Sequence, residues 1–180
     1  RRRIRVVDNG VDCEKFKPLA AGPTTASIVL FVGSFGHTPN RDAIGWLFSE
    51  IWPRIRAERP DARLQVVGAH APPEILAADG RDGIEVVGTV PDTAAYYRDA
   101  RVLLAPVRAG SGTRLKILEA FASGVPVVTT RLGAEGIAAQ DGEHLLTAES
   151  APELAAATCR VLADDFLARR LGESARALAE

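Results

Sequence analysis

The sequence has few cysteines, few aromatic residues and no long apolar run. Cys13 and Cys159 are the only cysteines, and neither lies in a C-x-x-C pair or a cysteine and histidine cluster, so no disulfide framework or zinc site is expected. The apolar runs are of strand length, whereas a membrane-spanning helix needs roughly 18 residues. No signal peptide is visible. We therefore expect a chain without a transmembrane segment that works in a reducing compartment.

The sequence also lacks an excess of charge of either sign. Its 22 Lys and Arg residues are balanced by 23 Asp and Glu residues, for a formal net charge of -1, so binding of nucleic acid or of an anionic membrane surface is not indicated. The locally basic start, Arg-Arg-Arg-Ile-Arg over residues 1–5, is typical of a solvated tail or linker. With 47% hydrophobic residues, the chain can bury one core. We assign residues 1–26 to a linker and domain start, and residues 27–180 to one domain.

Short β-rich runs alternate with longer amphipathic runs. We expect strands over residues 27–33, 62–68, 83–87, 101–105, 125–129 and 144–147, with helical stretches between most of them. Continuous apolar strands separated by helices predict a parallel sheet that is covered on both faces. The predicted fold class is therefore α/β, with a doubly wound, Rossmann-like parallel sheet.

Several helices can be placed by their ends and their apolar faces. Pro39-Asn40 is expected to cap a helix that runs to Glu58, and Pro91-Asp92 a short helix that ends near Tyr97. Residues 150–179 are predicted to form two helices that divide near Asp164-Asp165. Four aromatic residues fall at apolar helical positions and are assigned to the core: Trp46, Phe48, Trp52 and Phe121.

Ligands of an open α/β sheet bind beyond the carboxyl ends of its strands, so the strand exits are the candidate sites. The exit after residue 105 has the highest density of candidate residues. Its glycine-rich turn, Gly110-Ser111-Gly112-Thr113, allows a close approach of the backbone, and the N–H groups of the following helix start favour an anion. This turn is a candidate phosphate site.

Arg114 and Lys116 are predicted in the first turn of that helix, where cations oppose the helix dipole unless an anion is bound. Glu119, one turn further, can accept hydrogen bonds from the two hydroxyls of a ribose. An ordinary surface helix with a Lys116–Glu119 pair is the alternative interpretation.

At this point the sequence resembles a known family. Residues 112–130, which begin Gly112-Thr-Arg-Leu-Lys-Ile-Leu-Glu119, and the later Gly133-Ala-Glu-Gly136 resemble the donor-site signature of family-4-type glycosyltransferases (glycosyl transferases group 1). Residues 9–12 resemble the segment between the two domains of those enzymes, and residues 30–33 the first strand of their C-terminal domain. The resemblance implies the C-terminal half of a GT-B fold, without the N-terminal acceptor domain.

The family binds a nucleoside-diphosphate sugar, and its motifs imply site residues here. Arg114 and Lys116 match a Gly-Thr-Arg-Leu-Lys variant that contacts the diphosphate, and we assign them the catalytic role. Glu119 matches the second Glu of an E-x7-E motif, which binds the ribose, while Ser111 stands where the first Glu is usual. Further expected donor-site residues are Gly33, Ser34, His37, Gly112 and Thr113, with Val90 against the nucleobase.

Relatives commonly carry an Arg and then Lys-Gly after the glycine that corresponds to Gly33. This chain has Ser34 and no such cation pair. Arg114 and Lys116 are therefore expected to supply the missing positive charge.

The resemblance implies a retaining glycosyltransferase that transfers sugar to an acceptor hydroxyl in glycan, polysaccharide or glycolipid synthesis. The acceptor, a glycan or a lipid-linked acceptor, would bind through the missing domain, so the isolated chain is expected to be inactive. No Asp-x-Asp motif occurs, so we expect no metal and no resident cofactor. The expected location is the cytoplasm, at the inner membrane face through the other domain.

Two alternatives use the same architecture. The first is another enzyme, such as a sugar-nucleotide epimerase or a different GT-B-fold enzyme, but the additional catalytic carboxylates and histidines of an epimerase, or the cofactor lysine of a glycan phosphorylase, are not evident. The second is a non-catalytic nucleotide-binding module. Against it, the G-x-G-x-x-G fingerprint is absent after the first expected strand, where the glycines are Gly33 and Gly36.

Overall fold

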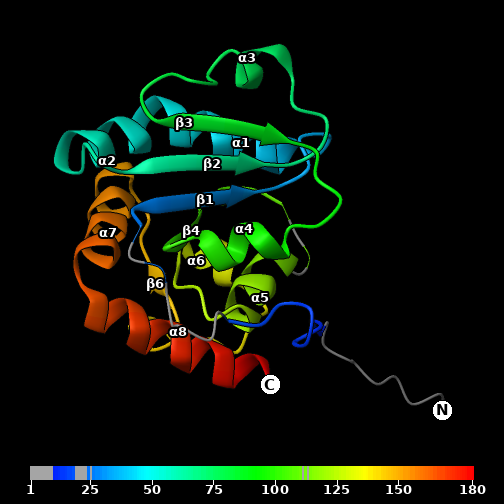
Figure 1. Cartoon of the computed structure of the whole chain (residues 1–180), viewed down its shortest axis with the longest axis vertical. Helices are drawn as coiled ribbons and strands as arrows, with labels where there is room; N and C mark the ends of the chain where they lie inside the picture. Colours follow the sequence, from blue (N-terminus) through cyan, green and yellow to red (C-terminus); the bar gives the residue numbers. More distant parts are fainter. Residues whose placement is uncertain (1–9, 19–23, 25, 111, 113) are drawn as a thin grey trace.

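A parallel six-stranded sheet forms the centre of the molecule (Figure 1). The computed structural model describes residues 10–18, 24, 26–110, 112 and 114–180. The strands are β1 (Ile28–Val32), β2 (Arg63–Val67), β3 (Ile84–Gly88), β4 (Val102–Ala105), β5 (Val127–Thr129) and β6 (Leu146–Thr147). Their order is β3-β2-β1-β4-β5-β6. The chain thus winds outward in both directions from β1 and β4, which confirms the predicted doubly wound sheet.

The six predicted strands are all present, and most are one or two residues shorter than predicted. The central strand β1 is paired on both sides, with Leu30 opposite Gln65 of β2 and Leu103 of β4. The runs of apolar residues in β1 and β4 follow from this position, because a strand covered on both faces buries every side chain.

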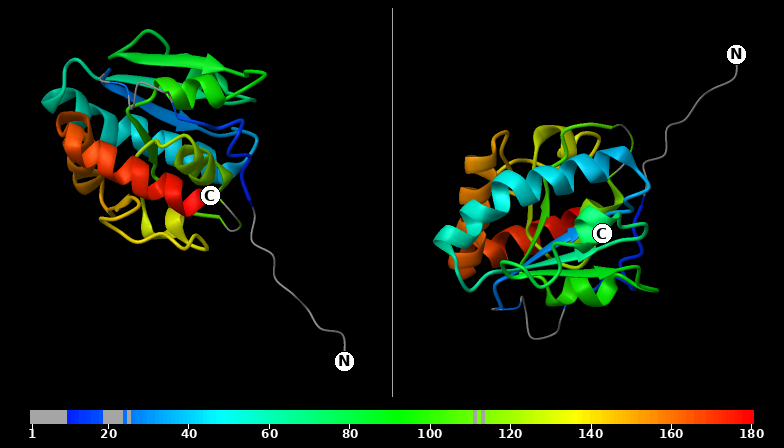
Figure 2. Two further views of the ribbon diagram at one scale, coloured as in Figure 1. Left: turned by 60° about the horizontal axis from the view of Figure 1, so that its bottom comes forward. Right: turned by 90° about the horizontal axis from the view of Figure 1, so that it is seen from above.

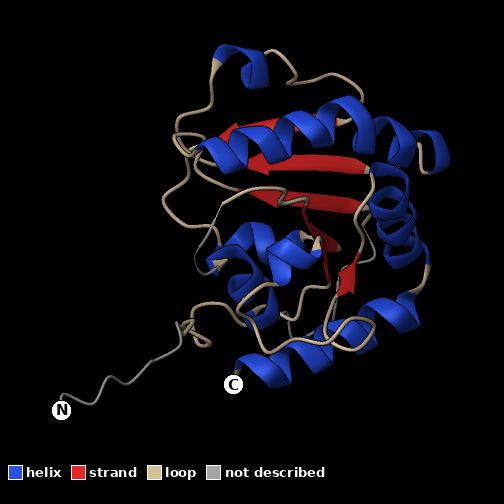
Figure 3. Cartoon of the chain, turned by 180° about the vertical axis from the view of Figure 1, so that it is seen from behind, coloured by secondary structure: helices blue, strands red, loops and turns tan. Residues whose placement is uncertain are grey.

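Helices cover both faces of the sheet (Figures 2 and 3). One cluster of buried side chains combines α1 (Thr38–Trp46), α2 (Trp52–Glu58) and α7 (Ala151–Ala163) with one face, and a second combines α4 (Ala94–Asp99) and α5 (Leu115–Ala122) with the other. α8 (Asp165–Ala179) contributes to both clusters. Two short helices, α3 (Pro73–Leu76) and α6 (Arg131–Ala134), lie in the connections after β2 and β5.

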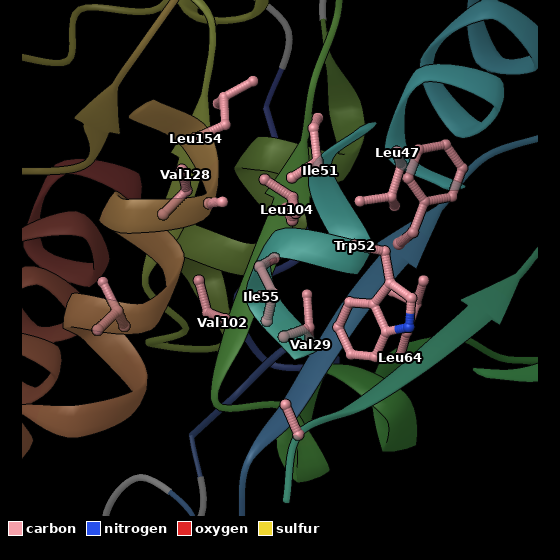
Figure 4. Packing of buried hydrophobic residues seen from close by; sticks show 14 of the residues in the cluster. Val29, Leu47, Ile51, Trp52, Ile55, Leu64, Val102, Leu104, Val128 and Leu154 are labelled. Carbon is pink, nitrogen blue, oxygen red and sulfur yellow. The ribbon is translucent and has the colours of Figure 1, made fainter. Parts of the chain in front are cut away.

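The first cluster is the larger of the two, and Figure 4 shows its centre. In it, Trp52 and Ile55 of α2 lie over Val29 of β1 and Leu64 of β2, and Leu154 of α7 lies near Val128 of β5. The predicted core positions of the aromatic residues are confirmed: Trp46, Trp52 and Phe121 are buried, and Phe48 packs against the cluster while partly buried.

The predicted cap at Pro39-Asn40 is wrong. α1 begins at Thr38 with His37 as its N-cap residue, and Pro39 occupies the first turn, where its missing N–H costs no helical hydrogen bond. Asn40 therefore lies inside the helix, and its side-chain Nδ2 donates to the carbonyl oxygen of Ser34 at 2.8 Å. The side chain that was expected to cap the helix is instead available to the loop after β1.

The helix that starts at Thr38 reaches Glu58 as predicted, but a π-helical turn over Leu47–Ile51 separates α1 from α2. Pro53 follows directly in the first turn of α2. Because proline has no N–H and its ring crowds the carbonyl group four residues earlier, the wider turn accommodates it without ending the helix.

The two C-terminal helices are confirmed, with the predicted division at Asp164. Ser150 and Glu153 form a reciprocal capping box at the start of α7, and the Asp164 carboxylate accepts from the Leu167 N–H at 2.9 Å at the start of α8. The predicted helix after Pro91-Asp92 is α4, which begins at Ala94 and continues to Asp99.

α8 also binds the segment at residues 13–16, which precedes the sheet. The Nη1 atom of Arg176 donates to the carbonyl oxygens of Cys13, at 3.1 Å, and of Phe16, at 2.9 Å. The same atom donates to the carbonyl oxygen of Ala122 at the end of α5. The entering chain, α5 and the last helix are therefore joined through one guanidinium group.

Gly68, directly after β2, lies against Gly33, directly after β1. A Cβ atom at Gly68 would fall deep inside the van der Waals radius of the Gly33 carbonyl oxygen, so we expect Gly68→Ala to lower the free energy of unfolding by about 1–3 kcal/mol. Gly45→Ala is the matched control, because a Cβ atom there meets nothing within 4 Å; in a helix this change gains up to about 1 kcal/mol. Urea denaturation measures both values, and equal stability of Gly68→Ala and wild type would contradict the close approach.

Candidate functional site

The candidate site lies at the carboxyl ends of β1 and β4, between which the winding direction of the sheet reverses. In Figure 1 the arrowheads of β1, β2 and β3 point to this edge of the sheet. The loop after β1 (residues 33–37) leads into α1, and the loop after β4 (residues 106–114) leads into α5. Two helix N-termini, each with partial positive charge, therefore lie at the two sides of the switch point, where ligands of doubly wound sheets bind.

The glycine-rich turn after β4 lies against the first turn of α1. Gly110 and Gly112 have φ values of 100° and 92°, which favour glycine. A Cβ atom at Gly110 would also lie 2.9 Å from Cγ of Pro39. The predicted donor residues Ser111 and Thr113 lie outside the described residues.

Arg114, at the N-cap position of α5, forms hydrogen bonds with this turn. Its Nη2 atom donates to the Gly110 carbonyl oxygen at 2.9 Å, and its Nη1 atom to the Gly112 carbonyl oxygen at 3.1 Å. The guanidinium group thereby connects Gly110 and Gly112 to the start of α5. Arg114 was predicted in the first turn of the helix, and it lies one residue before that turn, at the N-cap position.

Lys116 reaches across the switch point to the β1 side. Its Nζ atom donates to Oδ1 of Asn40 at 2.8 Å and lies 5.1 Å from the centre of the Phe31 ring. Within the described part of the chain Lys116 forms no salt bridge. Burial, together with repulsion from Arg114, lowers the pKa of Lys116 to about 8, and attraction by Glu119 opposes this shift. The site therefore holds a desolvated ammonium group whose contacts are uncharged, an arrangement that favours the arrival of an anion.

Glu119 is held by a buried tyrosine and not by Lys116. The Tyr97 hydroxyl of α4 donates to Oε2 of Glu119 at 2.8 Å and lies 3.1 Å from the Lys116 carbonyl oxygen. Burial and the charge of Glu119 raise the pKa of Tyr97 well above its usual value, so the hydroxyl keeps its proton. Oε1 of Glu119 accepts no hydrogen bond from the described residues. The alternative of a plain surface pair between Lys116 and Glu119 is therefore wrong, because the two side chains have different partners.

The predicted residues after β1 lie in the same cluster. Gly33 donates its N–H to the Val67 carbonyl oxygen at 3.0 Å, and a Cβ atom there would lie 2.8 Å from Cγ of Asn40. Ser34 is bonded to Asn40 through its carbonyl oxygen, and His37 is exposed at the start of α1. The structure thus brings Gly33, Ser34 and the turn after β4 together around Asn40.

Val90 is further from this cluster along the sheet. It follows β3, the edge strand, and is partly buried against the second core cluster. No hydrogen bond among the described residues joins it directly to Lys116 or Glu119. The link between this region and the cluster is indirect, because α4, which follows Val90, contacts α5 through Tyr97 and Glu119. The base contact at Val90 stays a prediction.

Three residues that contribute to the site could not be recognised in the sequence. Asn40 and Tyr97 bind the side chains of Lys116 and Glu119, and Asp42 binds Arg108 through two hydrogen bonds of 2.7 and 3.1 Å. This last pair joins α1 to the loop after β4. One signal was available for Tyr97, because a tyrosine on the buried face of a helix needs a partner for its hydroxyl.

A cavity of about 180 Å³ lies near the amino ends of β4 and β5, and Arg98, Ser123 and Arg176 help to line it. Arg176 is already bonded to three carbonyl groups there. In the described part of the chain no group of three or more His, Cys, Asp or Glu side chains could hold a metal ion. None of the described helices is both long and apolar enough to cross a membrane.

Comparison with known proteins gives matches over most of the chain. The family model for Glycosyl transferases group 1 matches residues 26–164. The phosphatidyl-myo-inositol mannosyltransferase of Mycolicibacterium smegmatis is 32% identical over 180 residues, which cover 95% of this chain and 45% of that protein. The chain thus spans less than half the length of this relative.

Two solved structures show the same fold. TarM of S. aureus, solved in a complex that contains UDP, has a TM-score of 0.79 at 16% identity and covers 98% of this chain and 36% of that one. The C-terminal domain of LpcC, a glycosyl transferase group 1 family protein of Francisella tularensis, has a TM-score of 0.70 at 20% identity, over 94% of this chain and 96% of that one. The fold predicted from the resemblance is confirmed.

Proposed function

Because the chain belongs to the glycosyl transferases group 1 family, we propose that it is the donor-binding domain of a retaining glycosyltransferase. The donor is a nucleoside-diphosphate sugar, and the acceptor is a hydroxyl group of a glycan or of a lipid-linked acceptor. One observation carries the proposal: the desolvated Lys116 ammonium lies between two helix N-termini, with an amide as its hydrogen-bond partner. A diphosphate supplies the charge that this group lacks.

In this proposal the diphosphate lies between the loop after β1 and the turn after β4. Lys116 contacts it directly, and the N–H groups at the start of α5 donate to it, with Ser111, Gly112 and Thr113 forming the turn. Arg114 orders that turn through the Gly110 and Gly112 carbonyl groups and adds positive charge. As the bond between sugar and diphosphate breaks, negative charge grows on the leaving group, and these fixed donors stabilise it without a metal ion.

The ribose is placed at Glu119, one turn into α5. Tyr97 holds Oε2, so Oε1 is oriented to accept hydrogen bonds from the ribose hydroxyls. The nucleobase is placed at the β3 exit against Val90, and the sugar near Ser34 and His37. This order follows the direction from the edge strand β3 toward the switch point.

The wider role is proposed by analogy with the relatives. The matched proteins include a phosphatidyl-myo-inositol mannosyltransferase and a lipopolysaccharide core biosynthesis mannosyltransferase, and a hexose donor used in glycolipid or polysaccharide synthesis is consistent with both. We assign residues 1–26 to the connection with an acceptor-binding domain that completes the active site, and we place the enzyme in the cytoplasm at the inner membrane face.

Titration of the 180-residue chain with UDP, GDP and NAD tests the donor class. We expect saturable binding of at least one of the two nucleoside diphosphates with a Kd of about 10 μM to 1 mM, since the closing domain is missing. NAD, whose pyrophosphate is flanked by two nucleosides, is expected to bind at least tenfold more weakly. Isothermal titration calorimetry measures both, and preferred binding of NAD would instead support a dinucleotide-binding module.

A further inference from the structure

The side chain of Asn40 contacts both the loop after β1 and α5, the helix that follows the loop after β4. Its Oδ1 atom accepts from Nζ of Lys116 at 2.8 Å, and its Nδ2 atom donates to the Ser34 carbonyl oxygen at 2.8 Å. The two hydrogen bonds use the acceptor and the donor of the amide, so its orientation is determined. The residue thereby connects α5 with the loop after β1, across 76 positions of the sequence.

The surroundings of Asn40 leave its side chain little freedom. Gly33 provides the space for it, because a Cβ atom at Gly33 would lie 2.8 Å from Cγ of Asn40. Pro39 fixes the backbone one residue earlier and packs against Gly110 of the other loop. The amide is therefore a rigid support, and the flexible lysine side chain takes its position from it.

The chemistry of the amide matters because Lys116 is desolvated. A carboxylate at this distance would form a salt bridge and neutralise the ammonium group. The Asn40 carbonyl group fixes the ammonium group by a hydrogen bond and contributes no negative charge that would neutralise it. Because Lys116 is partly exposed, its charge is then available to a second, anionic partner.

We propose that Asn40 is a positioning residue that holds the Lys116 ammonium group toward the donor diphosphate without neutralising it. This inference rests on the proposed function, since it takes the diphosphate as the anion. Through Asn40, the Lys116 ammonium group of α5 is held beside the loop after β1. That loop has Ser34 at the position where relatives commonly carry a cation.

A double-mutant cycle in the 180-residue chain tests the coupling. The variants are Asn40→Ala, Lys116→Met and both together, with UDP and GDP as probes in calorimetry. We expect Asn40→Ala to weaken binding of the preferred nucleotide about tenfold and Lys116→Met about 10- to 100-fold. In the Lys116→Met background, Asn40→Ala should have almost no further effect, because its support then has nothing to position.

Proton uptake supplies a readout that a purely structural role would not change. Near pH 8 about half of Lys116 is unprotonated, so binding of a diphosphate should draw up to about half a proton from the buffer. The charged groups that act on Lys116 are Arg114 and Glu119, and neither is altered in the variants. Asn40→Asp adds a carboxylate that keeps the lysine protonated, so uptake should disappear and affinity fall, whereas Asn40→Ala should retain the uptake. Calorimetry in buffers of different ionisation enthalpy measures this difference.

The outcomes separate the inference from the function on which it rests. Equal losses from Asn40→Ala with and without Lys116, or equal proton uptake in Asn40→Asp and Asn40→Ala, would overturn the positioning role. If Lys116→Met itself leaves nucleotide affinity unchanged, the proposed diphosphate site fails instead. Thermal unfolding of each variant, with Ser49→Ala as an exposed control in the π-helical turn after α1, shows whether a loss of binding comes from a loss of folding.

Discussion

Replacing Lys116 with methionine in the full-length enzyme is expected to lower kcat by about 10²- to 10³-fold, the loss that follows removal of one fixed donor to a developing negative charge. Methionine keeps the apolar stem over the Phe31 ring and removes only the ammonium group. Its effect should be larger on kcat than on KM, because the charge on the leaving diphosphate grows as the glycosidic bond breaks. Steady-state kinetics with the nucleoside-diphosphate sugar measures the two parameters. Arg114→Ala combined with Lys116→Met should leave almost no turnover.

The fold should survive this change, which makes the test informative. Removing a buried charge that lacks an anionic partner does not destabilise the ligand-free chain, because the cost of its desolvation is removed as well. Lys17→Met is the matched control, since that side chain is 66% exposed. A Lys116→Met enzyme with near-normal turnover would refute the assigned role, whatever the behaviour of Arg114.

Replacing Glu119 with alanine is expected to weaken binding of UDP or GDP by about 10- to 100-fold, because the ribose loses hydrogen bonds to a carboxylate. Binding of inorganic pyrophosphate should change less than twofold, since that probe has no ribose and depends on Lys116 and the glycine-rich turn. Calorimetric titration of the two probes against wild type and Glu119→Ala gives both ratios. A similar loss for both would place Glu119 at the diphosphate and contradict the assignment.

Tyr97→Phe is the companion variant for the same site. It removes the hydrogen bond that orients Glu119 but leaves the carboxylate in place, so we expect a smaller loss of nucleotide affinity than for Glu119→Ala. Conversely, in Glu119→Ala the Tyr97 hydroxyl can still donate to the Lys116 carbonyl oxygen, which lies 3.1 Å away. The buried hydroxyl therefore keeps a hydrogen-bond partner. A loss of binding in Glu119→Ala can therefore be attributed to the site and not to unfolding.

The sequence predicted the fold class and the strands well because both depend on a pattern that many residues share. Six apolar runs separated by helical stretches leave few arrangements other than a doubly wound sheet. The error at the start of α1 has a local cause. Asparagine before an apolar helical pattern is typical of an N-cap, but Pro39 is equally suited to the first turn, and the Asn40 side chain is committed to Ser34 and Lys116.

The candidate site was only partly predictable for a related reason. Motif spacing predicted Arg114, Lys116 and Glu119 on one helix, and the structure has Lys116 and Glu119 in α5 and Arg114 at its N-cap position. It could not show that Lys116 pairs with a residue 76 positions earlier, or that Glu119 pairs with Tyr97 of another helix. Such pairs follow from the order of strands in the sheet, which brings the loops after β1 and β4 together, and no short sequence window contains that order.

The guanidinium group of Arg176, which joins α8 to the segment at Cys13 and Phe16, has a mechanical consequence. A pulling force applied ahead of residue 10 would be transmitted through Arg176 to α8 and to the end of α5 before it reaches β1. Less of that force would then act on the sheet. If a neighbouring domain is attached there, its rotation would act first on the end of α5 at Ala122, and the opposite end of that helix carries Lys116.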